Sequence, residues 1–153
     1  MSLVLETERV FLRELLLNDV EPLETVLANA GASDKLSPPS ARAFILAQRD
    51  SYREHGLGVW AAVHRESGMV LGYAGLRRES ESDPELWCLI DVPYRGHGLG
   101  TEVATAILHH ARERIGVERV IAFVPPDDEG AHRFVETLGM SLDDGERHLF
   151  ATR

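Results

Sequence analysis

Three glycines at alternate positions separate a strand-like run from a helix-like run in the second half of the chain. The turn reads Arg95-Gly96-His97-Gly98-Leu99-Gly100-Thr101. The apolar run at 85–92 predicts a strand, the spacing over 99–115 predicts a helix, and 119–124 predicts another strand. These elements form a βαβ unit, whose crossover should be right-handed. A glycine turn that opens a helix is also an anion site, because its amides can point inward and the helix dipole adds to the attraction.

The remaining patterns predict one domain over residues 1–153, with a mixed sheet and helices on its faces. Strands are predicted at 4–14, 58–65, 69–77 and 147–152, and the two middle ones form a hairpin with its turn at 66–68. Helices are predicted from an N-cap at Asn18 to Gly31, over 41–54, and around the apolar positions of 131–138. The order is β-α-α-β-β-β-α-β-α-β, an α/β (α+β) fold class.

Composition excludes several classes of protein. A formal net charge of −9 argues against a sequence-independent nucleic-acid binder, which needs a basic surface. The chain has no apolar run of 18 residues, so no membrane span is predicted, and residues 1–13 lack a signal-peptide core. Its only cysteine, Cys88, cannot form an intrachain disulfide, which is typical of a reducing cytosol and predicts a cytoplasmic protein.

Three kinds of phosphate loop can be compared with the glycine turn. A P-loop needs Gly-Lys-Ser/Thr, which the chain lacks. A dinucleotide fingerprint, G-x-G-x-x-G, puts its third glycine at Thr101 or Val103, although Asp127 or Asp128 could serve as its ribose-binding acid. About fifty residues follow the turn, too few for the rest of a doubly wound sheet. The third kind, a coenzyme A loop, has the pattern Gln/Arg-x-x-Gly-x-Gly/Ala, which Arg95–Gly100 fits.

With this loop pattern and its surroundings, the chain resembles the GNAT acetyltransferase superfamily, and within it the RimJ/RimL-type branch that acetylates protein N-termini. The resemblance rests on these segments: Leu5–Arg13, Trp60–Val63, Leu71–Leu76, Pro84–Gly96 and Gly130–Met140. It covers nearly the whole chain. It implies the GNAT acyl-CoA N-acyltransferase fold, with a mixed, mostly antiparallel central sheet and helices on both faces.

The resemblance also implies acetyl-CoA as the cofactor and assigns residues to it. The loop amides would bind the pyrophosphate, and Arg95 would add charge; the residues concerned are Arg95, Gly96, His97, Gly98, Leu99, Gly100 and Thr101. Strands 85–92 and 119–124 would splay apart, so that the pantetheine arm bonds backbone at Ile90, Asp91 and Val92. Pro125 and Pro126 fit this, since they lack an N–H, but they also simply end a strand. Asp128 would bond the arm, or cap the helix that it precedes.

In the family a free amine attacks the thioester directly, helped by a general base and a backbone N–H. Glu85 is the first candidate for the base, with solvation at a strand start as its other interpretation. Strand alternation puts Glu85, Trp87 and Asp91 on one sheet face. Where the family often has a tyrosine that protonates the thiolate, this chain has Val135. Proton delivery to the leaving group is therefore unassigned.

Other chemistry-bearing residues have plainer interpretations. Trp60, Tyr73 and Trp87 could wall an acceptor pocket, although core packing is typical of large aromatics. The pair His109-His110 has no third ligand nearby, so no metal site is predicted. Cys88 is expected to be a small buried hydrophobe.

We therefore expect an N-acetyltransferase that acts on a primary amine, either a protein N-terminus or a small molecule. Both classes of acceptor stay open at this point, and so do a monomer and a homodimer. Two alternatives remain: a non-catalytic acyl-CoA sensor with the same fold, and a dinucleotide-dependent oxidoreductase.

Overall fold

The structure is a computed structural model, and it describes residues 3–31, 40–78, 82–142 and 149–152. Its eight-stranded sheet has the order β1-β2-β3-β4-β5-β6-β8-β7. The strands are β1 (Leu3–Glu6), β2 (Val10–Arg13), β3 (Val59–His64), β4 (Val70–Arg77), β5 (Glu85–Ile90), β6 (Ile121–Phe123), β7 (Ser141–Leu142) and β8 (Leu149–Ala151). Neighbouring strands are antiparallel except β5 and β6, which are parallel. A mixed, mostly antiparallel sheet was the expectation, and it is confirmed.

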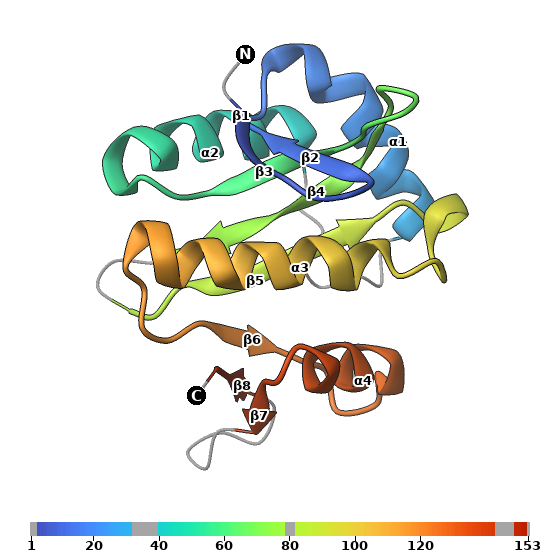
Figure 1. Cartoon of the computed structure of the whole chain (residues 1–153). Helices are drawn as coiled ribbons and strands as arrows, with labels where there is room; N and C mark the ends of the chain where they lie inside the picture. The colour runs from blue at the N-terminus through green and yellow to red at the C-terminus, as the bar shows by residue number, and fades with distance from the viewer. Residues whose placement is uncertain (1–2, 32–39, 79–81, 143–148, 153) are drawn as a thin grey trace.

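Four α-helices cover the two faces of this sheet (Figure 1). They are α1 (Val20–Ala30), α2 (Ala41–His55), α3 (Leu99–His110) and α4 (Glu129–Thr137), with short helical turns at Leu17–Asp19, Val92–Tyr94 and Ala111–Ile115. Residues of α3 and α4 share one core cluster with β5 residue Leu86, and residues of α1 and α2 share the other with Trp87 and Leu89. Successive residues of β5 thus pack on opposite faces, as the pleat requires.

The parallel strands β5 and β6 meet at one end only. Glu85 is in register with Ile121, and the amide of Ile121 donates to the Pro84 carbonyl at 3.0 Å. No further rung joins the two strands in the part of the chain that is described. Strand β6 ends at Phe123, two residues before Pro125, which has no N–H to continue a ladder. The two strands therefore diverge toward the end of the sheet at which α3 begins (Figure 1).

The prediction of one strand over residues 4–14 is wrong, because the chain reverses in it to form the antiparallel pair β1 and β2. Thr7 makes the reversal. Its amide donates to the Val10 carbonyl at 2.7 Å, and its Oγ1 accepts from the Val10 amide at 3.1 Å. A threonine side chain that bonds nearby backbone competes in this way with an extended ladder.

Other boundaries also differ from the sequence prediction. The N-cap of α1 is Asp19 rather than Asn18, because residues 17–19 form a helical turn of their own. The helix predicted over 99–115 becomes a π-helical turn from Ala111 onward. Strand 147–152 is confirmed over 149–151, which form β8; residue 152 follows the strand, and 147 and 148 lie outside the described residues. The short strand β7 was missed. Among the described residues, no helix is long and apolar enough to cross a membrane.

Candidate active site

The glycine turn adopts the conformation that an anion-binding loop needs. Gly96 has a φ of 84° and Gly98 a φ of 79°, in the left-handed region that favours glycine. Gly98 is also the N-cap of α3, and no side chain of the described residues caps that helix start. Since the first amides of a helix have no acceptor within it, those of Leu99, Gly100 and Thr101 face outward from the first turn. The loop thus offers several N–H groups at the positive end of a helix dipole.

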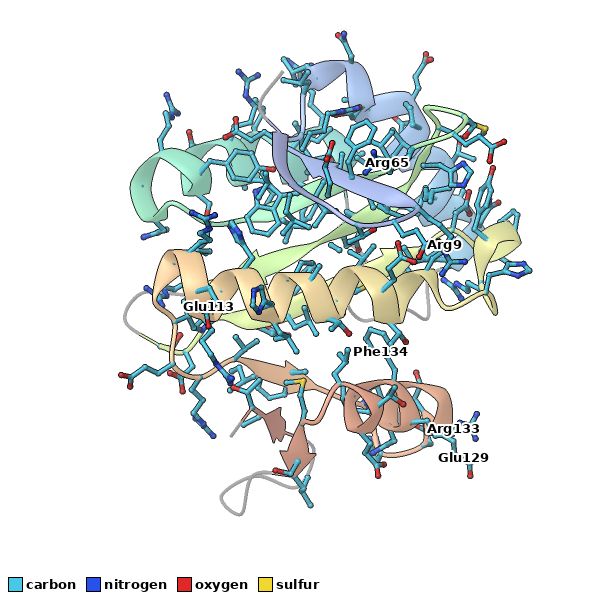
Figure 2. The ribbon with its side chains drawn as sticks, viewed as in Figure 1. Arg9, Arg65, Glu113, Glu129, Arg133 and Phe134 are labelled. Atoms are coloured by element: carbon cyan, nitrogen blue, oxygen red, sulfur yellow. The ribbon has the colours of Figure 1, made fainter. Side chains whose placement is uncertain are left out.

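The side chains of the loop have different surroundings. Leu99 is buried in the core, so only its amide is available to a ligand. His97 is exposed, whereas Gly100 stands against α4, with a ring carbon of Phe134 3.5 Å from the point a Cβ would occupy (Figure 2). Arg95 turns back toward β5, where its Nε donates to the Ile90 carbonyl at 2.8 Å. This contact brings a guanidinium to the end of β5 that lies next to the loop.

The backbone of β5 shows which residues face the gap beside β6. The Asp91 amide donates to Leu71 on the β4 side, and the Pro84 carbonyl accepts from Ile121 on the β6 side. Because the direction of backbone groups alternates along a strand, the amides of Cys88 and Ile90 point toward β6. At these two positions β6 provides no partner among the described residues. Unpaired strand amides beside an anion loop are the groups that can bind an extended ligand.

The structure does not support a backbone role for Asp91. Its amide is used by Leu71, and its carbonyl accepts from the Tyr94 amide at 2.9 Å. Its side chain is buried and accepts from Asn29 at 2.9 Å. The amide of Ile90 does point into the gap, and Val92 is exposed beyond the end of β5. The sequence analysis did not identify Cys88, whose amide points into the gap as well. Strand alternation would have identified Cys88 if the direction of one backbone hydrogen bond of β5 had been known.

Glu85 lies where β5 and β6 meet, at the opposite end of β5 from the glycine loop. It is partly buried, in register with Arg77 of β4 and on the face that carries Trp87. Trp87 is buried beside Phe44 and Tyr73, with ring centroids 6.0 and 6.5 Å away. The indole Nε1 of Trp87 has no acceptor among the described residues.

The three aromatic residues singled out in the sequence do not form one pocket wall. Trp60 packs in the other core cluster, on the α3 face. Its ring centroid lies 6.0 Å from that of His110, in an edge-on arrangement. Tyr73 and Trp87 belong to the α1–α2 face. Tyr73 is 0% exposed and Trp87 is 8% exposed, so of the three aromatic residues only Trp87 offers even a small surface beside Glu85.

Two further predictions concern α4 and the cysteine. Asp128 is the N-cap of α4, and its Oδ1 accepts from the Ala131 amide at 3.0 Å, which is the capping role. Val135 is 3% exposed and belongs to the core.

Burial raises the pKa of Cys88 to about 12, so its thiol stays protonated at neutral pH. Among the described residues, no three His, Cys, Asp or Glu side chains gather as a metal site would need.

A contact that the sequence analysis missed ties the β1–β2 turn to the start of α3. Glu102 accepts from the Thr7 hydroxyl at 2.5 Å, from the Arg9 amide at 2.9 Å and from Arg9 Nε at 2.8 Å. Burial opposes its ionisation, but these donors outweigh it and lower the pKa of Glu102. Arg9 also reaches the loop itself, since its Nη1 donates to the His97 carbonyl at 3.0 Å. The partners lie about ninety residues apart, and no spacing rule could have found them.

Comparisons with known proteins agree with this geometry. Residues 9–141 match the model of the acetyltransferase (GNAT) domain. An acetyltransferase from Agrobacterium tumefaciens is similar in structure, with a TM-score of 0.85 at 21% identity, covering 100% of this chain and 95% of that one. RimL, a ribosomal L7/L12 alpha-N-protein acetyltransferase in complex with coenzyme A, has a TM-score of 0.80 at 10% identity and covers 98% and 97%. A ribosomal-protein-S5-alanine acetyltransferase from Vibrio fischeri has a TM-score of 0.77 at 13% identity and covers 97% and 94%.

Proposed function

This chain belongs to the GNAT acetyltransferase family, and from that premise we propose that it transfers an acetyl group from acetyl-CoA to a primary amine. The observation that carries the proposal is the glycine loop at the open end of the β5–β6 gap. An anion site lies there, followed along β5 by the amides of Cys88 and Ile90, for which β6 provides no partner in the part of the chain that the structure describes. Coenzyme A has a diphosphate followed by a long amide-containing arm, and this order of groups fits that order of donors.

The residues that would hold acetyl-CoA follow from their position. The amides from Gly96 to Thr101 bind the diphosphate, with Arg95 as a nearby cation. The amides of Cys88 and Ile90 donate into the gap, to the arm and to the thioester carbonyl. Bound acetyl-CoA supplies the acetyl group as a thioester, whose carbon–sulfur bond breaks as the carbon–nitrogen bond forms.

Glu85 serves as the general base in this proposal. It accepts, through a water molecule, the proton that the amine loses on becoming an amide. Its position where the strands meet puts it at the closed end of the gap, beyond the reach of the loop that holds the phosphates. Val135 cannot donate a proton, so the departing sulfur takes one from water.

The acceptor approaches from the α1–α2 face in this proposal. Glu85 lies on that face and is only partly buried, so its carboxylate can meet the acceptor there, whereas the Trp87 ring is buried against Phe44 and Tyr73. Among the similar structures, RimL is named an alpha-N-protein acetyltransferase and the Vibrio fischeri protein a ribosomal-protein-S5-alanine acetyltransferase, which favours a protein α-amine over a small-molecule amine.

Release of free coenzyme A thiol tests the activity. We expect acceptor-dependent release from acetyl-CoA with some member of a panel of peptides, polyamines and aminoglycosides. Glu85→Gln should lower the rate by about 10²-fold or more while acetyl-CoA affinity stays unchanged. Glu118→Gln, which removes an exposed carboxylate just before β6, should leave the rate unchanged.

The buried Val135 favours one second candidate, an acyl-CoA sensor that binds without turnover. Tight acetyl-CoA binding with no thiol release from any acceptor would support the sensor and contradict the enzyme. Absence of coenzyme A binding would contradict both.

A further inference from the structure

Two hydrogen bonds from the guanidinium of Arg9 hold this side chain beside the glycine loop. Its Nε donates to Glu102, and its Nη1 donates to the His97 carbonyl. The third nitrogen, Nη2, has no acceptor within the described ranges, and it lies 3.7 Å from the point at which a Cβ on Gly98 would stand. Figure 2 shows the side chain beside the start of α3. One N–H₂ group, without an acceptor among the described residues, thus lies close to Gly98, the N-cap of this helix.

The charge of Glu102 explains why a cation is needed at this point. Glu102 lies in the first turn of α3, where it would repel a phosphate bound at the same helix end. Its carboxylate is turned to the β1–β2 turn, where Thr7 and Arg9 use both of its oxygens. Arg9 therefore neutralises the one acid of the first turn and keeps it directed away from the loop.

We propose that Arg9 binds the diphosphate of the acyl carrier through Nη2, as a second cation beside Arg95. This inference rests on the proposed function, since it needs coenzyme A at the loop. It adds a residue from the β1–β2 turn to a site otherwise built from β5 and α3. A guanidinium that is already fixed by two hydrogen bonds loses little further freedom on binding an oxyanion.

Titration of three probes tests the assignment: coenzyme A, dephospho-coenzyme A, which lacks only the 3′-phosphate, and pantetheine, which has no phosphate. Arg9→Ala should raise the Kd about tenfold for coenzyme A and for dephospho-coenzyme A alike, and leave pantetheine binding unchanged. Arg9→Lys should recover part of the loss, because the charge remains. The double variant Arg9→Ala/Glu102→Gln should also recover part, because the exposed acid is removed.

Arg65→Ala is the matched control. Arg65 also supports the β1–β2 turn, with its Nη1 donating to the Thr7 carbonyl at 3.1 Å and lying 3.6 Å from Glu6, but it does not contact the loop. Arg65→Ala should leave the Kd for coenzyme A unchanged, and because its ion pair with Glu6 is exposed it should lower the free energy of unfolding by no more than Arg9→Ala does.

Three results would overturn the assignment to the diphosphate. The first is a Kd for Arg9→Ala within twofold of the wild-type value, and the second is an equal loss for pantetheine. The third is a loss confined to coenzyme A, which would place Arg9 on the 3′-phosphate instead. If the wild-type protein binds no coenzyme A at all, the proposed function fails, and that result is distinct from a failure of Arg9.

Discussion

Gly98 has a backbone conformation that a β-branched residue adopts only with strain, and its amide belongs to the proposed phosphate site. Its φ is 79°, and Gly116, at the end of the helical turn after α3, has a φ of 81°. Valine at either position should lower the free energy of unfolding by about 1–3 kcal/mol. Only Gly98→Val should also weaken coenzyme A binding, by at least about tenfold, because the side chain fills the place of the phosphate.

Urea unfolding and coenzyme A titration of both Gly98→Val and Gly116→Val distinguish the effect of backbone strain on stability from the loss of the binding site. The loop assignment is wrong if the Gly98 variant binds coenzyme A as the Gly116 variant does.

At the scale of elements, an ion pair holds the end of β2 to the turn that leads into α1. Arg13 donates to both oxygens of Asp19, at 2.7 and 2.8 Å, and the Leu16 amide donates to the same carboxylate at 2.8 Å. Burial disfavours the charge of Asp19, but these hydrogen bonds outweigh it and lower its pKa. A depressed folded-state pKa gives stability that is complete above the unfolded pKa of about 4 and is lost as the pH falls through the folded value.

Asp19→Asn should therefore lower the free energy of unfolding at pH 7 by about 3 kcal/mol, since Arg13 then remains buried without its counter-charge. The difference from wild type should shrink steadily as the pH is lowered below 4. Chemical unfolding at pH 7 and pH 3 measures it. Asp50→Asn, which breaks an exposed pair with Arg53 on α2, should change stability by less than about 0.5 kcal/mol at either pH. Equal effects of the two substitutions would contradict this account of Asp19.

Periodicity and glycine placement are sufficient to predict most of these elements, because each is set by neighbours in the sequence. The hairpin of β3 and β4, the helix start at Gly98 and the amphipathic α4 all follow from local patterns. A local pattern cannot reveal a conformation that is determined by residues distant in the sequence. Thr7 reads as a strand residue until its hydrogen bonds with Val10 and Glu102 are known. Likewise, Cys88 faces the gap only because β6 ends early, and Trp60 is separated from Trp87 by the register of the strands.

At the scale of the whole molecule, the β5–β6 gap divides the sheet into two unequal parts. The larger part carries β1 to β5, and the smaller carries β6, β8 and β7. Their backbones share one parallel rung, so the smaller part is attached mainly through side-chain packing, with Ala122, Val124 and Val135 in the core cluster that also holds residues of α3. A ligand that lies in the gap and bonds both sides would replace the missing rungs.

Native-state hydrogen exchange should reveal this division. In the free protein we expect the amides of β6 and β8 to exchange through an opening of lower free energy than that of β3 and β4, because few backbone bonds hold the smaller part. Saturating coenzyme A should slow exchange in β6 and at Cys88 and Ile90, and at 100 times its Kd should raise the opening free energy of the smaller part by up to about 2.7 kcal/mol. Pantetheine, with the arm but not the diphosphate, serves as the comparison. Equal protection of both parts in the free protein would contradict the division of the sheet. Slowing confined to the glycine loop would mean that the ligand binds without joining the two parts.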